Sequence, residues 1–528
     1  MTEIPGDRLG PARRQDWLTF VAAGGIAVLL GSVLADLLRF GPVDDGFISL
    51  RYARNWAGGM GLVFNPGERV EGYTNFLLVL LEAAAIRLGI DPLTAMKGVG
   101  WAALGALAGT IAFWAGRLLY PTRPVLAALA GLLVTLNPAV LGWTLSGMET
   151  PIYALLLFLL ATSVLGAGGG ANPLLVAGLL ALAAMTRPEG VVLLPALLFL
   201  HVAGGGTRRG AGRLAVSFAI AYGVYFLLRA LHFESLFPNT FYAKLDYGNQ
   251  HLALRGLRYV GSFAIAAPLL ALSAAAPIFL RGRLAWVRGF LLLAGIHILT
   301  VVYEGGDHFA LFRFMVPILP LLSLLALHFW SRLARANRLP PVAREAIGAI
   351  GPAVLLASCF TLAGVEYKEY QVSHLERFRR EASYAQSWST MGKHLRDRAP
   401  EGASLSTAAI GAIGYYSDLR VIDPHGLVNR EIGRREKTLG LGYPGHEKFD
   451  VDYILSERPS YLLLLNLPLP AAVPEETAAR MVWGEFNKAI VRDPRLRSDY
   501  RYEQVRLGGP CWGIHVRKDL PPLGDRAR

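Results

Sequence analysis

Charged residues and cysteine are both scarce in this sequence. Only 17% of its 528 residues are charged, whereas 53% are hydrophobic. An ordinary soluble enzyme has about 25% charged residues, so this balance excludes that class and indicates a membrane protein. The only two cysteines lie far apart, Cys359 in an apolar run and Cys511 near the polar C-terminus. Neither a disulfide framework nor a zinc site is therefore expected.

The net charge of +13 does not indicate nucleic acid as a partner. Much of the arginine lies in short clusters between apolar runs, where basic residues orient membrane spans and contact anionic lipid. The loops with these clusters are expected to be cytoplasmic. The clusters consist of Arg13, Arg14, Arg117, Arg123, Arg208, Arg209, Arg213, Arg281, Arg283, Arg288, Arg332, Arg335 and Arg338.

Apolar runs predict about eleven transmembrane helices, since a span needs about 20 apolar residues. The predicted spans are 17–38, 94–116, 124–138, 151–167, 173–186, 190–204, 213–232, 258–280, 285–303, 313–331 and 346–364. Segment 73–90 is also apolar, but a crossing there would turn every later arginine loop outward. We therefore expect it to be a helix at the outer interface. The first run lacks a small-residue cleavage site, which predicts an uncleaved signal anchor.

From residue 365 the chain becomes charged and mixed, with short strand-like runs, which predicts a water-facing domain with its own core. Within it, "SLSTAAIGAIGYYSDLRVIDPHGLVN" predicts a strand, a glycine-containing helix, a second strand and then a loop. The expected fold is an α-helical polytopic membrane protein with a C-terminal α/β domain on the outer side. The transmembrane domain is predicted over 1–364, with interfacial helices in the outer loop 39–93, and the α/β domain over 365–528. The arginine pattern predicts that this domain lies on the outer side of the membrane.

The loops left on the outer side hold nearly every unusual polar group: 39–93, 138–150, 187–190, 233–257 and 304–312. Ionisable groups at a membrane interface cost several kcal/mol unless they are paired, so this collection is a functional-site hypothesis. Carboxylates can act as a base or nucleophile, while arginine, lysine and histidine can hold a phosphate. This mixture suits an enzyme that cleaves a sugar from a polyprenyl phosphate.

Several motifs carry a family resemblance: "DDGFISLRYARN", "GLVFNPGERVEGYTN", "SGMET", "TRPEG", "PNTFYAK", "GGDHF" and "IDPHGL". With them the chain resembles the GT-C superfamily of glycosyltransferases, and more narrowly the mycobacterial terminal arabinofuranosyltransferase AftB and its relatives. The resemblance implies a GT-C type fold and a decaprenyl-phosphoryl arabinofuranose or other polyprenyl-phosphate furanose donor. It also implies a glycan, glycolipid or glycoprotein acceptor at the cell surface, and retention of configuration. A place in the bacterial inner membrane, with the active site and the C-terminal domain on the periplasmic side, is implied as well.

Asp44 and Asp45, directly after the first span, are the predicted catalytic residues. Asp44 is preferred, by analogy with the acid that opens the corresponding GT-C motif. The alternative is that one of them caps the helix that follows.

Four residues are predicted to bind the donor phosphate: Arg187, Lys244, His308 and Arg313. Arg187 lies in an apolar stretch, where an uncompensated cation is costly. Its alternative partner is Glu189. His308 alternatively pairs with Asp307, and Arg313 alternatively snorkels from its helix end.

The remaining candidates are polar or aromatic residues suited to binding a sugar or the acceptor. They are Arg51, Glu71, Tyr73, Asn75, Glu149, Asn239, Tyr242, Asp307 and His425. The alternatives are an interfacial ion pair for Arg51, a solvated loop for Glu71 and Asn75, stabilisation of a helix start for Glu149, and a surface loop for His425.

No cofactor is required by this chemistry, because arginines can supply the positive charge, although carboxylates with a phosphate could also hold a divalent ion. Other functions stay open. One alternative is a GT-C enzyme that transfers mannose, glucose or aminoarabinose, and another is a glycan polymerase or ligase. A transporter or flippase is disfavoured, because the polar groups gather on one face and no symmetry between halves is visible.

Overall fold

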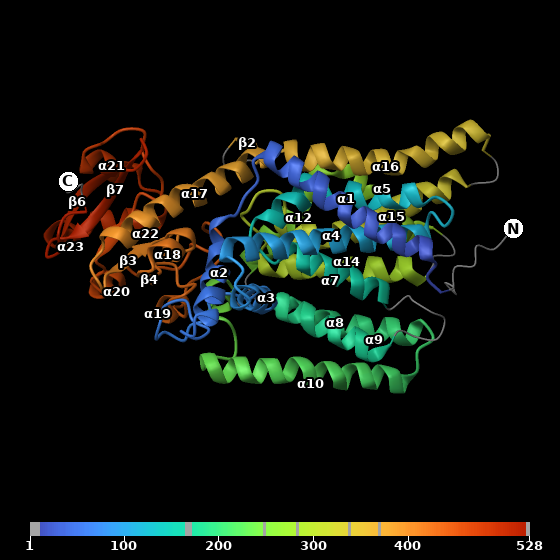
Figure 1. Cartoon of the computed structure of the whole chain (residues 1–528), viewed down its shortest axis with the longest axis horizontal. Coiled ribbons are helices and arrows are strands. Elements are labelled where there is room, and N and C mark those ends of the chain that lie inside the picture. Colours follow the sequence, from blue (N-terminus) through green and yellow to red (C-terminus); the bar gives the residue numbers. More distant parts are fainter. Residues whose placement is uncertain are drawn as a thin grey trace.

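Long apolar helices form a bundle, and a smaller domain of helices and one main sheet follows at one end of it (Figure 1). The computed structural model describes residues 11–163, 172–245, 250–280, 285–335, 339–367 and 371–523. Arg281, Arg283 and Arg338 of the predicted cytoplasmic clusters lie outside these ranges. The expected α-helical polytopic fold with a C-terminal α/β domain is confirmed.

Each predicted span is an apolar helix or a bent helix pair in the structure. Within the described ranges, six are long and apolar enough to cross a membrane, or eight if each bent pair is one span. The six are α1 (Arg14–Leu38), α4 (Pro92–Leu118), α10 (Arg208–Phe233), α14 (Ala285–Glu304), η3 (Arg313–Ile318) continued by α15 (Leu319–Ala334), and α16 (Pro341–Gly364). The bent pairs are α5 (Pro124–Thr135) with α6 (Pro138–Leu145), at 62°, and α12 (Gln250–Ala266) with α13 (Pro268–Ala275) and η2 (Ala276–Phe279), at 100°.

The other three predicted spans are shorter apolar helices with a proline in their first turn. They are α7 (Thr150–Ser163), α8 (Pro173–Thr186), and η1 (Pro188–Leu193) continued by α9 (Leu194–Ala203). Proline suits the first turn of a helix, where its missing N–H leaves no bond unmade. Asn172 caps α8 by accepting a hydrogen bond from the backbone of Leu174 at 3.0 Å. These starts divide the apolar sequence into separate helices.

The outer surface of the bundle is apolar. Four leucines on two helices are each more than 60% exposed: Leu29 and Leu37 on α1, and Leu228 and Leu231 on α10. Of the most apolar 18-residue stretch of α10, only 17% is buried inside the protein, whereas the buried share is 78% for the corresponding stretch of η3 with α15. α15 therefore belongs to the core and α10 to the edge, where lipid rather than water suits its leucines.

The ends of the helices that carry described arginine clusters lie far from the C-terminal domain (Figure 1). Near one end, Arg117 lies 3.4 Å from Asp16, and Arg335 donates to the carbonyl of Leu119 at 2.9 Å. At the other end, the carbonyl of Phe233, the last residue of α10, accepts from Arg430 of the C-terminal domain at 2.6 Å. The 26 residues of α10 separate these two ends by about 39 Å.

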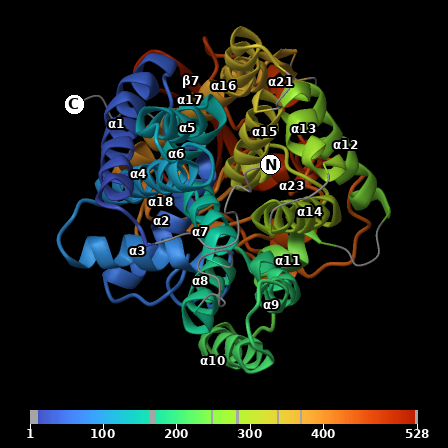
Figure 2. The same cartoon turned by 90° about the vertical axis from the view of Figure 1, so that its right-hand side faces the viewer.

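Two helices of the first predicted outer loop, α2 (Asp44–Ala57) and α3 (Phe76–Arg87), lie between the bundle and the C-terminal domain. Figure 2 looks along the bundle and shows α3 lengthwise, across the direction of α4. Its 12 residues span about 18 Å, too short to cross the hydrocarbon layer. This is the geometry expected of an interfacial helix in segment 73–90.

The C-terminal domain begins after α16 with a two-stranded hairpin, β1 (Glu366–Tyr367) and β2 (Val372–Ser373), and then α17 (His374–Arg398). Its main sheet has the order β4-β3-β5-β7-β6. β3 is parallel to β4 and β5, whereas β7 is antiparallel to β5 and β6. The strands are β3 (Ser404–Thr407), β4 (Arg420–Ile422), β5 (Tyr461–Leu463), β6 (Tyr500–Arg506) and β7 (Cys511–Arg517).

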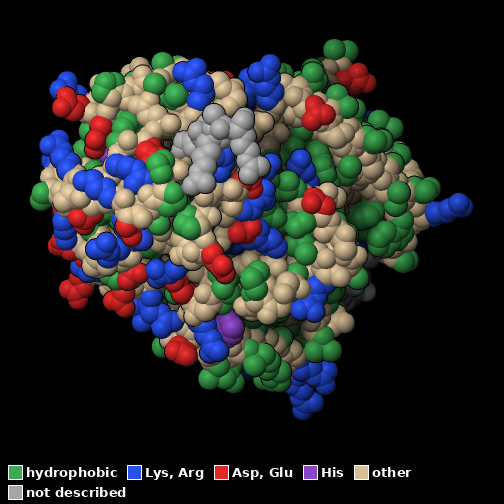
Figure 3. All heavy atoms as spheres, turned by 60° about the vertical axis from the view of Figure 1, so that its left-hand side comes forward, with side chains coloured by type: hydrophobic (Ala, Val, Ile, Leu, Met, Phe, Trp, Pro, Cys, Tyr) green, Lys and Arg blue, Asp and Glu red, His purple; other side chains and the backbone are tan. Residues whose placement is uncertain are grey.

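Short helices connect these strands. They are α18 (Ala412–Ser417), α19 (Arg430–Gly433), α20 (Val451–Ser456), α21 (Glu475–Met481), α22 (Glu485–Arg492) and α23 (Pro494–Asp499). The strand, helix and strand read from the sequence between residues 404 and 422 are β3, α18 and β4. Charged side chains are dense over this domain in Figure 3, whereas apolar ones are prominent over the bundle.

Candidate active site

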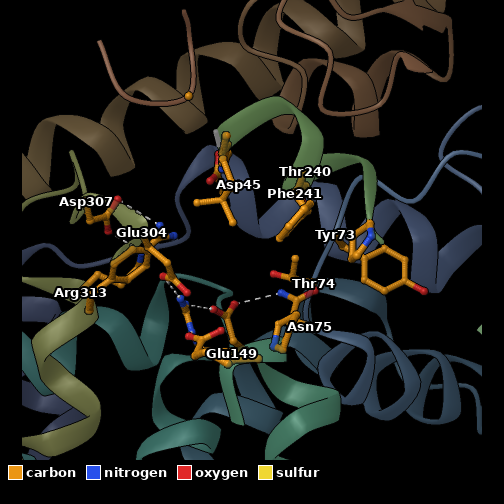
Figure 4. Close-up of a pocket in the computed structure, with 18 of the residues that line it drawn as sticks. Asp45, Tyr73, Thr74, Asn75, Glu149, Thr240, Phe241, Glu304, Asp307 and Arg313 are labelled. Atoms are coloured by element: carbon orange, nitrogen blue, oxygen red, sulfur yellow. Dashed lines mark hydrogen bonds and ion pairs between the residues drawn. The ribbon is translucent and has the colours of Figure 1, made fainter. Parts of the chain in front are cut away.

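A cavity of about 420 Å³ lies at the junction between the bundle and the C-terminal domain. The starts of α2 and α3, the turns before α7 and η1, and the loop between α14 and η3 contribute to its wall. α11 (Asn239–Lys244) supplies another part, and Leu427, Pro444 and Gly445 supply the contribution of the C-terminal domain. Figure 4 shows Asp45 on the opposite side of this space from Glu149 and Asn75.

Nine of the residues predicted from sequence line the cavity. They are Asp45, Tyr73, Asn75, Glu149, Arg187, Lys244, Asp307, His308 and Arg313. They come from six segments that are distant in sequence, so the fold brings together most of the polar groups singled out in the outer loops.

Asp44 and Asp45 lie in different environments. Asp44 accepts hydrogen bonds from the backbone N–H groups of Gly411, at 3.0 Å, and Ala412, at 2.7 Å. Burial raises the pKa of Asp44 to about 7, against the lowering effect of these bonds. Asp45 lines the cavity, and within the described part of the chain its carboxylate has no hydrogen-bond or ion-pair partner. Of the two predicted catalytic residues, Asp45 therefore lies on the cavity wall, whereas Asp44, the preferred one, does not.

A close backbone approach explains why Asp44 faces the C-terminal domain. A Cβ atom at Gly411 would lie only 1.9 Å from the carbonyl oxygen of Asp44. Glycine thus allows the start of α18 to press against the start of α2, with the carboxylate of Asp44 receiving two N–H groups there.

Arg187 enters the cavity already surrounded by carboxylates. Its guanidinium lies 2.9 Å from Glu149 and 3.5 Å from Glu304, and it also pairs with Glu189. Burial acts to raise the pKa of Glu149, but the charges of Arg187 and Arg313 outweigh it and lower that pKa below its usual value. The predicted alternative of a pair with Glu189 is thus present, together with two further acids.

Arg313 is paired in a similar way. Its Nε and Nη2 donate to the two carboxylate oxygens of Asp307 at 2.6 and 3.1 Å, an arrangement that fixes the guanidinium plane. The Phe309 ring lies 4.6 Å from the guanidinium carbon. Asp307 also accepts from the backbone N–H of His308 at 2.9 Å. Asp307 therefore organises the loop between α14 and η3.

Lys244 differs from both arginines. It is the last residue of α11 and lines the cavity, yet among the described residues no hydrogen bond or ion pair holds its ammonium group. His308 lies close enough to be affected by this charge: burial, and then the neighbouring cations His446, Arg313 and Lys244, hold the pKa of His308 well below its usual value. A neutral His308 beside an unpaired Lys244 leaves this wall able to accept an anion.

Asn75 and Tyr73 contribute differently to the wall. The Asn75 amide donates to Glu149 at 3.0 Å and its oxygen accepts from Ser49 at 3.0 Å, so it fixes the position of the Glu149 carboxylate. The Tyr73 ring points away from the centre of the cavity (Figure 4) and packs 4.8 Å from the Tyr52 ring. Tyr73 is thus part of the packing behind the site.

Five predicted binding residues lie outside the cavity lining. Arg51 is buried and donates to the carbonyls of Phe64, Gly414 and Leu419. Glu71 forms a buried ion pair with Arg229, 2.7 Å apart. Arg51 therefore does not form an exposed ion pair at the interface, and Glu71 does not lie in a solvated loop, because both side chains are buried.

Asn239, Tyr242 and His425 join the domains or shape the C-terminal one. The Asn239 amide donates to the carbonyl of Gly426 at 2.6 Å, tying α11 to the C-terminal domain. The carbonyl of Tyr242 accepts from Lys448 at 2.9 Å. His425 is only 6% exposed, and its ring lies 4.6 Å from that of His446. None of the three lines this cavity, but His425 lines a second cavity within the C-terminal domain.

Sequence reasoning missed Glu304, Arg255 and Thr240, which also line the cavity. Glu304 ends the apolar helix α14 directly before the "GGDHF" motif, and an acid at the end of such a run is a signal that could have been read. Arg255 donates to the carbonyl of Gly305 at 3.0 Å. Thr240 lies inside the "PNTFYAK" motif, whereas nothing in the local sequence of Arg255 points to the cavity.

Within the described part of the chain, no group of three or more histidine, cysteine or acidic side chains is arranged to hold a metal ion. The acids around Arg187 are instead bridged by its guanidinium.

Comparison with known proteins identifies the fold. Residues 373–511 match a family described as a domain of unknown function (DUF8728). No curated protein is significantly similar in sequence. Among solved structures, ArnT from Cupriavidus metallidurans bound to undecaprenyl phosphate has a TM-score of 0.54 at 13% identity, and the match covers 97% of this chain and 100% of that one. The chain has the fold of ArnT.

A second ArnT structure from Cupriavidus metallidurans, in the apo state, has a TM-score of 0.47 at 16% identity, with 76% of this chain and 86% of that one covered. The ArnT likeness agrees with the GT-C type architecture expected from sequence.

Proposed function

We propose that this protein is a glycosyltransferase that moves a sugar from a polyprenyl-phosphate donor to an acceptor at the outer face of the membrane. The observation that carries the proposal is the cavity itself, where the carboxylate of Asp45 and the ammonium group of Lys244 share one space between the bundle and the C-terminal domain. Neither group has a hydrogen-bond or ion-pair partner among the described residues. A phosphate leaving group needs a cation, and an attacking hydroxyl or a developing sugar cation needs a carboxylate.

The fold supports the choice of donor. ArnT, whose fold this chain shares, has been solved with undecaprenyl phosphate bound. A polyprenyl tail needs an apolar surface beside the polar site, and the cavity is lined by apolar side chains of the bundle side as well, including Val192, Phe237 and Phe241. We place the phosphate against Lys244, with Arg313 and neutral His308 next to it.

The reaction breaks the bond between the anomeric carbon and the phosphate oxygen, and the electron pair leaves with the polyprenyl phosphate. A new bond forms between that carbon and an acceptor hydroxyl, whose proton passes to a base. In a single displacement, Asp45 takes that proton. If configuration is retained through a covalent intermediate, Asp45 attacks the anomeric carbon first; the acceptor hydroxyl then displaces the Asp45 carboxylate from that carbon and gives its proton to the released polyprenyl phosphate. On the far wall, Arg187 forms an ion pair with Glu149, and Glu149 accepts a hydrogen bond from Asn75. These fixed polar groups orient the sugar hydroxyls.

The sugar proposed is a furanose, with D-arabinofuranose first and retention as the outcome, on the strength of the motifs around residues 44–75 and 238–244. Aminoarabinose, mannose and glucose are the alternative sugars. The side proposed for the site is the periplasmic one, because the described arginine clusters lie at the opposite end of the bundle.

The test is a donor panel. Purified full-length protein in lipid nanodiscs is incubated with synthetic polyprenyl-phosphate arabinofuranose, aminoarabinose, mannose and glucose, and released polyprenyl phosphate is measured by mass spectrometry. We expect release from one donor, with arabinofuranose first. Consumption of a hexose donor alone would replace the furanose assignment, and no release from any donor, with or without acceptor glycans, would contradict the transferase.

A further inference from the structure

A second cavity, of about 500 Å³, lies within the C-terminal domain. All residues that line it lie between Ala408 and Lys488, so no membrane-spanning helix contributes to it. Its size is that of a site for a ligand of a few rings. A polyprenyl tail is a poor fit, because charged side chains such as Lys437 and Glu485 share the wall.

One loop separates this cavity from the candidate active site. Pro444 and Gly445 line the first cavity, whereas Tyr443 and His446 line the second. The rings of Tyr443 and His308 are 5.0 Å apart, and His308 belongs to the first cavity. A ligand in the second cavity would thus lie one loop away from the proposed donor site.

Aromatic side chains form one wall of the second cavity. The Trp483 ring lies 4.7 Å from that of Tyr443, at 90°, and 6.3 Å from that of His446. Trp483 is 51% exposed although it belongs to a water-facing domain. A large apolar ring kept open to solvent beside polar groups marks a binding surface, since its burial would be favourable.

A polar atom in the same wall lacks a partner. The side-chain oxygen of Asn466 is buried and accepts no hydrogen bond within the described residues. Leaving such an acceptor buried without a donor is unfavourable, because it has lost its hydrogen bonds to water. A ligand hydroxyl would supply the donor, while the apolar face of a sugar ring would cover Trp483.

We propose that this second cavity binds the saccharide acceptor, with Trp483 covering a sugar ring and Asn466 accepting from a sugar hydroxyl. The inference rests on the proposed transferase function and names the acceptor class as a saccharide rather than a polypeptide. The loop formed by residues 440–446 then lies between acceptor and donor, so the acceptor extends over it toward Asp45.

The experiment combines binding and kinetics on the full chain. Binding of an arabinofuranose hexasaccharide and of a mannose hexasaccharide, without donor, is measured by titration calorimetry for wild type, Trp483→Ala, Asn466→Ala and Met481→Ala. Met481 is the matched control, because it is 50% exposed, two residues from Trp483, and does not line the cavity. With the consumed donor, the acceptor KM is measured for the same proteins.

We expect one hexasaccharide to bind wild type and Met481→Ala equally, and at least tenfold more weakly to Trp483→Ala and Asn466→Ala. The acceptor KM should rise in Trp483→Ala and Asn466→Ala but not in Met481→Ala. Trp483→Phe should recover part of the affinity that Trp483→Ala loses. Asn466→Ala should not lower the melting temperature, because its oxygen has no protein partner to lose. Unchanged binding and KM in both variants, or effects only with a peptide acceptor, would overturn the inference.

The two proposals fail differently. If wild type releases no polyprenyl phosphate from any donor, the transferase function fails. If release and transfer occur but Trp483→Ala and Asn466→Ala behave as Met481→Ala does, only the acceptor site is wrong. Absence of saccharide binding to wild type also contradicts the acceptor site.

Discussion

Asp44 and Asp45 are adjacent in the chain, but the Asp44 carboxylate receives the N–H groups of Gly411 and Ala412 while that of Asp45 lines the cavity. The first aspartate joins the C-terminal domain to the bundle. The carboxylate of the second has no partner among the described residues and lies at the proposed site of chemistry. A substitution at Asp44 should therefore lower stability, whereas one at Asp45 should lower activity.

Replacement of Asp44 by asparagine should lower stability. One carboxylate oxygen becomes an NH₂ group, which cannot accept from a backbone N–H, so one of two hydrogen bonds is lost at a cost of about 1–3 kcal/mol. The melting temperature of the variant should fall, as followed by intrinsic fluorescence. Asp397→Asn is a suitable control, because that carboxylate is 63% exposed. Equal melting temperatures for the Asp44 variant and wild type would contradict the structural role.

Replacement of Lys244 by alanine should weaken donor binding. A hydrogen bond to a charged group contributes about 1.5–3 kcal/mol, which corresponds to a rise in donor KM of roughly tenfold to a hundredfold. Lys244→Arg should retain most of the affinity, since it keeps the charge. Lys97→Ala, an exposed residue of α4, is the control. A donor KM in Lys244→Ala that matches this control would exclude Lys244 from the phosphate site.

The buried pair of Glu71 and Arg229 should show strong coupling. Their side chains are only 2% and 5% exposed and lie 2.7 Å apart. Arg229→Met leaves the Glu71 carboxylate buried without its cation, which costs about 3–5 kcal/mol, whereas Arg229→Met with Glu71→Gln should recover much of that loss. Melting temperatures of the two single variants and the double variant measure the coupling. Additive effects would show that the pair does not interact.

Two histidines of the C-terminal domain should make stability depend on pH. Burial, joined for His446 by the charge of His425, lowers both pKa values to about 4. In the unfolded chain the pKa is about 6.5, so between pH 6.5 and 4 the unfolded state binds more protons. Their contribution is therefore complete above pH 6.5 and is lost as the pH falls toward 4.

This contribution is measured as a difference between proteins. When the pH is lowered from 7.5 to 5, the melting temperature of the double variant His425→Asn with His446→Asn should decrease less than that of wild type. Raised pKa values of Asp44 and Glu381, both about 7, act with the opposite sign but equally in both proteins. Parallel pH profiles would contradict the assignment.

The spans could be predicted because hydrophobicity is a local property of about 20 consecutive residues. The same is true of the strand, helix and strand between residues 404 and 422. The collection of polar groups at one end of the bundle also followed from sequence, because arginine clusters indicated which loops share a face. Nine of the predicted residues consequently line one cavity.

Partners distant in sequence could not be predicted. The choice between Asp44 and Asp45 depends on Gly411, 367 residues away, and the burial of Glu71 depends on Arg229, 158 residues away. No periodicity or motif near either acid carries that information. The contacts of Arg51 could not be predicted for the same reason, since its carbonyl partners Gly414 and Leu419 belong to another domain.

The most direct test of the account is the rate of polyprenyl phosphate release by Asp45→Asn compared with Asp44→Asn, each in lipid nanodiscs with the donor that wild type consumes. Asn keeps the size of the side chain but removes its charge and basicity. We predict that the Asp45 variant loses at least a hundredfold in kcat at an unchanged melting temperature, while the folded fraction of the Asp44 variant retains activity. Full activity of Asp45→Asn would contradict the proposed mechanism.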